Sequence, residues 1–139
     1  MSEFKSLGKS GVYSESFESP EDALEPIDIR EGKHLHEIQF ASDEVAAVCP
    51  VTGQPDWYTV SIRFRPNGKS LESKSLKLYL QAFKNTGIFC EMFADRICAD
   101  ITETINPLVL SVIVVQKSRG GITLTAQAGH TSGGFDFPE

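Results

Sequence analysis

The sequence has no long hydrophobic run and few cysteines, and these absences exclude several classes of protein. Its longest apolar stretch, residues 108–115, is interrupted by Ser111 and is far too short to cross a bilayer as a helix. The first six residues, Met-Ser-Glu-Phe-Lys-Ser, are polar and do not resemble a secretory signal. Three cysteines without a CxxC pair do not suggest a disulfide framework, so we expect a reducing, cytoplasmic location.

Basic residues are also scarce, since 13 Lys and Arg face 19 Asp and Glu, for a formal net charge of −6. A nucleic-acid-binding protein needs a basic face, so we expect no direct nucleic-acid partner, and equally no membrane partner. A length of 139 residues suits one domain over 1–139. Within it we expect an extended N-terminal arm over 1–32 and a polar tail over 127–139.

Hydrophobic periodicity predicts four strands and two helices. Alternating or continuous apolar residues indicate the strands, and apolar residues spaced three and four apart indicate the helices. In chain order we expect strands over 34–40 and 57–65, helices over 76–83 and 93–101, and strands over 108–115 and 122–126.

This order predicts an α+β fold, with a four-stranded antiparallel sheet and two helices on one of its faces. A loop is expected over 42–56, and the second helix should end at Asn106-Pro107. The strand over 108–115 is apolar on both faces, so both should be covered. The last strand should turn Ile122, Leu124 and Ala126 inward. Exposed edges of the sheet are expected to pair with other copies of the chain.

The loop from Cys49 to Asp56 carries the first candidate chemistry, because it places a thiol and a carboxyl in one turn-rich segment. A thiolate can attack an electrophilic carbon while a nearby acid delivers a proton. An ionised Asp56 should raise the pKa of the thiol, so the resting state we expect is a thiolate beside a protonated acid. The alternative is that Cys49 is a buried thiol that packs like a small apolar residue.

Lysines at the start of the first predicted helix form a second candidate site. Lys74, Lys77 and Lys84 fall on the face opposite the apolar residues. Amide donors and the helix dipole favour an anion at a helix N-terminus, and these lysines would add charge for a phosphate. Equally, they could form an ordinary solvated face.

Two further positions have both a ligand-binding and a structural interpretation. Glu91 begins the second predicted helix, where a carboxylate either recognises a pair of ligand N–H groups or complements the dipole. Arg119, followed by two glycines, either binds phosphate or belongs to a hairpin turn. The three histidines have no metal-ligand spacing with any cysteine, so we expect no metal site.

Taken in order, these motifs resemble those of the NADPH-dependent 7-cyano-7-deazaguanine reductases, the nitrile reductases of queuosine biosynthesis. The Glu72–Tyr79 stretch, Glu-Ser-Lys-Ser-Leu-Lys-Leu-Tyr, separates this family from GTP cyclohydrolases with the same tunnel-forming fold. The resemblance runs from about Val48 to Ile122. The other residues that carry it are Cys49–Asp56, Phe83, Asn85, Gly87, Phe89, Glu91 and Arg119–Ile122.

The resemblance implies a role for each matching residue. Cys49 would add to the nitrile carbon to give a covalent thioimide, and Asp56 would protonate the nitrile nitrogen. Glu91 would hold the pyrimidine edge of the deazaguanine. The remaining substrate-binding positions would be Leu71, Glu72, Ser73 and Cys90, and the NADPH-binding positions Lys74, Lys77 and Arg119.

The resemblance also implies a tunnelling fold whose subunits join sheet to sheet into a barrel. The small members form decamers of two pentamers, with active sites at subunit interfaces. Cys90 stands where the family usually has histidine, which donates hydrogen bonds and shuttles protons better than a thiol. This difference suggests the hypothesis that Cys49 and Cys90 form a reversible disulfide.

Two other functions remain open on the sequence. A relative of the family would keep the Cys49 thioimide but transfer ammonia, giving an amidine without NADPH. A non-catalytic module would bind a deazapurine or pterin and form no adduct. A zinc cyclohydrolase would need a metal.

Overall fold

The most regular alternation in the sequence forms the centre of the sheet. Tyr58, Val60, Ile62 and Phe64 are all buried on one face of a single strand, as the period of two requires. The computed structural model describes residues 17–133. In chain order its elements are η2 (Pro20–Ala23), β1 (Pro26–Asp28), β2 (Ile38–Val48), β3 (Pro55–Arg65), β4 (Lys69–Leu71), α1 (Ser73–Gln81), η3 (Ala82–Asn85), α2 (Cys90–Ile105), β5 (Val109–Arg119) and β6 (Ile122–Thr131).

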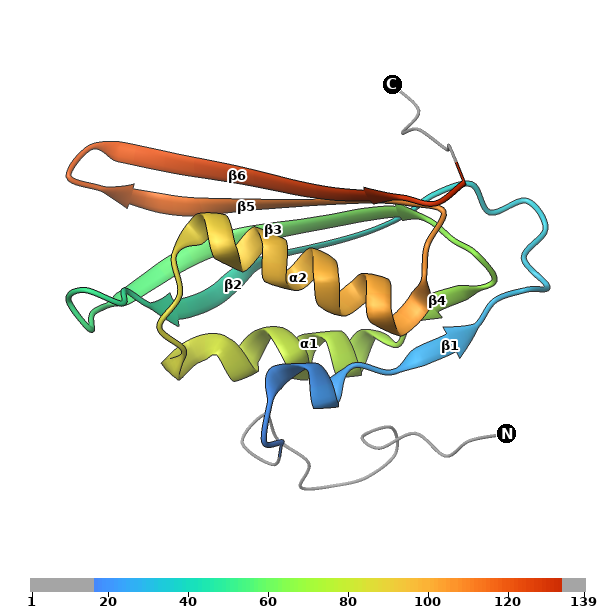
Figure 1. Ribbon diagram of the computed structural model, residues 1–139, viewed down its shortest axis with the longest axis horizontal. Coiled ribbons are helices and arrows are strands. Elements are labelled where there is room, and N and C mark those ends of the chain that lie inside the picture. The colour runs from blue at the N-terminus through green and yellow to red at the C-terminus, as the bar shows by residue number, and fades with distance from the viewer. Residues whose placement is uncertain (1–16, 134–139) are drawn as a thin grey trace.

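The main sheet is four-stranded, in the order β2-β3-β5-β6, and every neighbouring pair is antiparallel. Both α1 and α2 lie on the same face of this sheet (Figure 1). The predicted α+β class and the order strand, strand, helix, helix, strand, strand are therefore confirmed. A separate two-stranded sheet of β1 and β4 was not predicted.

Strand β2 is longer than predicted, and the expected loop over 42–56 is wrong for its first part. The strand continues to Val48, so the connection to β3 spans only residues 49–54. The polar residues Ser42-Asp43-Glu44 form an irregularity, where the register with β3 shifts between Ser42 and Val45. Past this bulge the inward alternation resumes, because Val45 and Ala47 are buried.

The last two strands also differ from expectation. Ile122 is 72% exposed instead of inward, because it lies at the tip of the β5–β6 hairpin (Figure 1). Leu124 and Ala126 do pack against the core. Strand β6 continues to Thr131, so the polar segment predicted from Gln127 is still sheet at its start. On β5, Ile113 remains half-buried, so this chain alone does not fully cover the second face.

Part of the predicted N-terminal arm is docked on the body. Ala23 and Leu24 are buried, and β1 pairs with β4. The Glu72 amide donates to the Glu25 carbonyl at 2.8 Å, which joins this segment to the start of α1. The rest of the arm, 1–16, and the end of the predicted tail, 134–139, lie outside the described residues.

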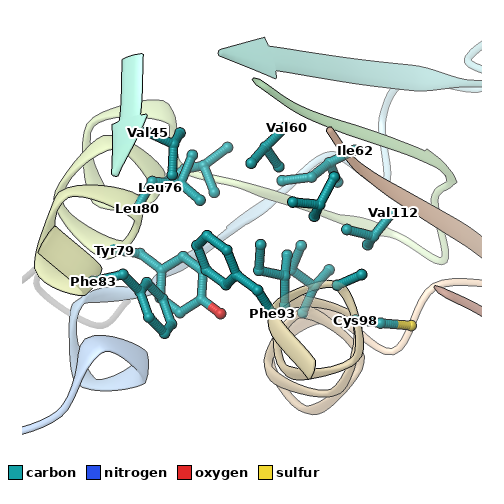
Figure 2. Close-up of a cluster of buried hydrophobic side chains, with 14 of the residues drawn as sticks. Val45, Val60, Ile62, Leu76, Tyr79, Leu80, Phe83, Phe93, Cys98 and Val112 are labelled. Carbon is teal, nitrogen blue, oxygen red and sulfur yellow. The ribbon is translucent and has the colours of Figure 1, made fainter. Parts of the chain in front are cut away.

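A chain of aromatic rings connects the helices to the sheet. Phe83 lies 5.1 Å from Tyr79 and 4.8 Å from Phe93, and Phe93 lies 5.2 Å from Tyr58, between ring centroids. Figure 2 shows Tyr79, Phe83 and Phe93 gathered between α1 and α2. This packing fixes the start of α2 against β3. Among the described residues, no helix is long and apolar enough to cross a membrane.

Candidate active site

Cys49 lies in a tight turn between β2 and β3. Its amide donates to the Gln54 carbonyl at 2.8 Å, and its carbonyl accepts from the Gly53 amide at 2.9 Å. Gly53 has a φ of 74°, in the left-handed region that a residue without Cβ adopts most easily. The turn therefore presents the Cys49 thiol at the end of the sheet, directly before the strand that carries Asp56.

A short parallel bridge brings the start of α2 to the same place. The Val48 amide donates to the Thr86 carbonyl at 2.9 Å, and the Ile88 amide donates to the Val48 carbonyl at 3.0 Å. Helix α2 begins two residues later, at Cys90. The structure thus brings Cys90 and Glu91 to the end of the sheet that holds Cys49, although they are 41 and 42 residues away in sequence.

Hydrogen bonds around the Cys49 sulfur favour its ionised form. The Thr52 hydroxyl has the largest effect, followed by the backbone amides of Thr52 and Val51, and the Arg119 guanidinium adds to them. Together they lower the pKa of the Cys49 thiol to about 7. A thiol with this pKa is substantially ionised near neutral pH, as a nucleophilic cysteine requires. Sequence reasoning missed Thr52, although a threonine three residues after a cysteine in a turn was a usable signal.

Asp56 is buried at the start of β3, with only 4% of its surface exposed. Its Oδ1 accepts a charge-assisted hydrogen bond from Arg119 Nη1 at 2.5 Å. Arg119 Nη2 also lies 3.5 Å from Gln54 Oε1. The carboxylate raises the pKa of the Arg119 guanidinium, as expected for an ion pair.

This ion pair was not part of the expected resting state of the site. A protonated Asp56 beside a thiolate was predicted, because two negative groups repel each other. The structure adds a guanidinium next to Asp56, and the same guanidinium helps to lower the pKa of the Cys49 thiol. Arg119 therefore supplies a positive charge beside both groups, which the prediction did not include.

Cys90 is buried at the first turn of α2, with 1% of its surface exposed. Its sulfur lies 3.6 Å from the Val114 carbonyl and 3.9 Å from the Leu124 carbonyl. Burial raises the pKa of this thiol, so it stays protonated and donates to the sheet. Cys49 and Cys90 are both free thiols here, so the structure does not contain the hypothesised disulfide.

Tyr58 completes this end of the molecule and is fully buried on β3. Its ring packs edge-on against Phe93, and its hydroxyl lies 3.5 Å from Gln116 Oε1. Burial raises the pKa of the phenol most, and the charges of nearby acidic groups raise it further. Those groups are Asp56, Cys90, Cys49 and Glu91, so the charges of all four act on the Tyr58 hydroxyl.

The other predicted substrate residues, Leu71, Glu72 and Ser73, lie at the opposite end of the molecule from Cys49. Figure 1 places β4 and the start of α1 at one end, and the β2–β3 turn, the β5–β6 hairpin and the start of α2 at the other. Leu71 is buried in the core and Ser73 is exposed. Glu72 caps α1, since its carboxylate accepts from the Lys74 and Ser75 amides at 2.7 and 2.8 Å. One chain therefore does not unite all the predicted site residues.

The predicted cofactor residues are divided in the same way. Lys77 and Ser73 line a groove of about 290 Å³ between α1 and β2, which also has an apolar wall from Leu76 and Leu80. Lys74 is half-buried on the same helix. Arg119 is at the far end and is engaged by Asp56. Within residues 17–133, no cluster of three or more His, Cys, Asp or Glu could hold a metal ion.

Comparison with known proteins identifies relatives of this chain. Residues 55–133, more than half of the chain, match the family model described as QueF-like protein. A protein of Chlorobium chlorochromatii named NADPH-dependent 7-cyano-7-deazaguanine reductase is 38% identical over 80% of this chain and 96% of its own length. This chain belongs to the QueF family of 7-cyano-7-deazaguanine reductases. The family resemblance predicted from the motifs is confirmed.

Other members of the family match with similar coverage. The reductase of the same name from Frankia casuarinae is 47% identical over 66% of this chain and 74% of its own length. The reductase of the same name from Bacteroides thetaiotaomicron is 35% identical over 96% of this chain and 87% of its own length. A crystal structure of the archaeosine synthase QueF-Like in the apo form superimposes with a TM-score of 0.67 at 22% identity, covering 75% of this chain and 100% of that one. This last likeness confirms the family fold.

Proposed function

We propose that this protein is a cytoplasmic, NADPH-dependent enzyme that reduces the nitrile of 7-cyano-7-deazaguanine to the aminomethyl amine, for queuosine biosynthesis. Family membership and the names of the relatives support this reaction and its cofactor. The observation that carries the proposal is the Cys49–Asp56 turn. It holds a thiol of pKa about 7 and a buried carboxyl in one site.

In the first step, the Cys49 sulfur forms a bond to the nitrile carbon, and one C–N π bond becomes a lone pair on nitrogen. Asp56 is the group we assign to pass a proton to that nitrogen, giving a neutral thioimide. Its carboxylate first takes up the proton that the Cys49 thiol releases, or one from water where the thiol is already ionised. A nitrile carbon accepts hydride poorly, and the thioimide C=N accepts it more readily. The carboxyl is 4% exposed, so the proton is handled away from bulk water.

The pyrimidine edge of the substrate is assigned to Glu91, which is exposed at the first turn of α2 and belongs to the cluster around Tyr58. A carboxylate accepts from two neighbouring N–H groups of a guanine-like edge. Cys90 stands where the family usually has histidine, and its thiol donates to the Val114 carbonyl of the sheet. We therefore assign Cys90 to the wall of the pocket and not to proton transfer.

Leu71, Glu72 and Ser73 are assigned to the same substrate pocket, but on a second copy of the chain. Their position at the end opposite Cys49 supports a site formed between subunits (Figure 1). Within residues 17–133, β2 and β6 each have one neighbour in the main sheet, so the outer edge of each can pair with a further strand. We propose a barrel built sheet to sheet, as a decamer of two pentamers.

The groove beside α1 fits a phosphate-bearing cofactor in the chemistry of its donors. Lys77 supplies an ammonium group and Ser73 a hydroxyl, next to apolar side chains that suit a ring. Lys74 would add charge at the same helix start, and Arg119 of a neighbouring copy is the third cation we assign. When bound, NADPH supplies hydride to the substrate, and the protein supplies position and charge.

The proposed function is tested by NADPH oxidation with purified protein, with and without 7-cyano-7-deazaguanine. We expect oxidation only with the nitrile present, with two molecules of NADPH consumed per amine formed. Cys49→Ala should abolish it, and Cys98→Ala should not, because Cys98 lies on α2 away from the site. An amidine product formed from ammonia without NADPH would instead identify an amidinotransferase.

A further inference from the structure

The turn between β5 and β6 places Arg119 with little freedom. Arg119 is the last residue of β5, and Gly120 and Gly121 follow with φ of 59° and 82°. Two successive residues with positive φ make the two-residue hairpin turn that suits the twist of paired strands. A Cβ added at either glycine would meet no atom within 4 Å, so glycine is needed here for backbone conformation.

From this turn, the Arg119 side chain contacts three residues of the Cys49 loop. It donates to Asp56 Oδ1 at 2.5 Å and to Gln54 Oε1 at 3.5 Å, and it hydrogen-bonds to the Cys49 sulfur. The planar guanidinium can serve all three acceptors at once, because its donors form a fixed fork. The contacts connect β5 to the loop before β3, across 63 residues of sequence between Arg119 and Asp56.

The surroundings explain why a cation is needed at this point. Asp56 is buried, and a buried carboxylate without a partner is costly. The charges that act on neighbouring Tyr58 come from Asp56, Cys90, Cys49 and Glu91, all of which are neutral or negative. Without a guanidinium, the Cys49 thiolate would therefore form near the carboxyl groups of Asp56 and Glu91, and their negative charge would oppose it.

We propose that Arg119 is a positioning residue of this site, whose guanidinium neutralises Asp56 so that the Cys49 thiolate and the Asp56 carboxylate coexist in the free protein. This inference rests on the proposed function, because the reaction needs both a nucleophile and an acid–base group. It gives Arg119 a role toward the thiol and the carboxyl of its own chain, in addition to the cofactor contact assigned above.

The test is the rate of Cys49 alkylation by iodoacetamide as a function of pH, in the full-length protein without substrate. In Arg119→Gln we expect the midpoint to rise by about one pH unit or more, because Asp56 is then uncompensated. Arg119→Lys should recover part of the shift, because it restores the charge without the fork. Lys117→Gln removes the same charge from the same strand without contacting Asp56 or Cys49, and its midpoint should match wild type.

A double variant separates charge compensation from simple support of the loop. In the Asp56→Asn background the carboxylate that Arg119 pairs with is absent, so adding Arg119→Gln should move the midpoint by only a few tenths of a unit. An equal shift in both backgrounds, or no shift in Arg119→Gln alone, would overturn the proposal. Alkylation needs no turnover, so a protein that fails to oxidise NADPH but shows these shifts would contradict the proposed function and leave this inference standing.

Discussion

The three cysteines of this chain differ in what surrounds each sulfur, and this decides which of them can react. Cys49 receives hydrogen bonds from Thr52, Val51 and Arg119, which lower its pKa to about 7. Burial raises the pKa of the thiols of Cys90 and Cys98. Reactivity in this protein therefore follows from local donors and exposure, and the residue type alone does not decide it.

We predict that iodoacetamide modifies Cys49 first among the three, with a rate that rises with pH and reaches half its maximum near pH 7. The rate rises with pH because the thiolate, and not the thiol, is the nucleophile. The rate therefore falls as the pH drops through the lowered pKa of Cys49. Thr52→Val removes the strongest donor, and the rate at pH 7 should fall roughly fivefold if the pKa rises by about one unit.

Peptide mapping after short exposure, with Thr125→Val on β6 as the matched control, checks this prediction. Preferential labelling of Cys90, or an unchanged midpoint in Thr52→Val, would show that the Cys49 turn does not activate its thiol.

At the scale of elements, helix α1 depends on an acidic cap. The Glu72 carboxylate accepts two amide hydrogen bonds from the first turn, and the Glu72 amide is bonded to the docked N-terminal segment. A carboxylate at this position satisfies amides that have no partner within the helix and complements the dipole. Glu72 therefore has a structural role in its own chain beside the substrate role assigned to it.

Replacing Glu72 with alanine should lower the free energy of unfolding by about 1 kcal/mol, the usual cost of losing an N-terminal cap. Urea unfolding monitored by circular dichroism would measure it. Glu103→Ala, at an exposed position inside α2, is the control and should change stability little. Equal stability of both variants would mean that the cap contributes nothing measurable.

Elements with an unbroken period could be predicted from sequence, and those with an interruption could not. Strand β3 and helix α2 were predicted because their inward positions are apolar from Tyr58 to Phe64 and from Phe93 to Ile101. The end of β2 was missed because Ser42-Asp43-Glu44 reads as a loop, whereas the chain absorbs it as a bulge. The sequence placed Cys49 and Asp56 together because one short loop contains both. It did not predict that Asp56 pairs with Arg119, because this pairing depends on how β5 and β6 meet the β2–β3 turn.

At the scale of the whole molecule, the residues of the candidate site are divided between two opposite ends of the folded chain. Cys49, Asp56 and Glu91 belong to the β2–β3 turn, the start of β3 and the start of α2. Figure 1 places these elements at the end opposite the start of α1, which follows Glu72. Large apolar side chains are also exposed near the Cys49 end, namely Val51, Trp57, Phe89, Met92 and Ile122. Exposed apolar groups of this size are typical of a surface that another chain covers.

We predict that two inactive variants restore activity when they assemble together. Cys49→Ala and Glu72→Gln each remove one half of the proposed site, and glutamine keeps one acceptor for the α1 cap. In co-expressed mixed oligomers, about a quarter of the interfaces combine an intact Cys49 with an intact Glu72, so about a quarter of the wild-type rate should return. Cys49→Ala with Cys49→Ser should restore none. A mixture as inactive as its parents would contradict a site shared between chains.

The measurement that tests the central claim most directly is the intact mass of the protein after incubation with 7-cyano-7-deazaguanine. We predict a mass gain equal to the whole mass of the nitrile compound, because the thiol adds to the nitrile to form the thioimide and no group leaves. The gain should be absent in Cys49→Ser and should disappear when NADPH is added, as the amine is released. Turnover of the nitrile without any adduct on Cys49, or an adduct that persists with NADPH, would contradict the account.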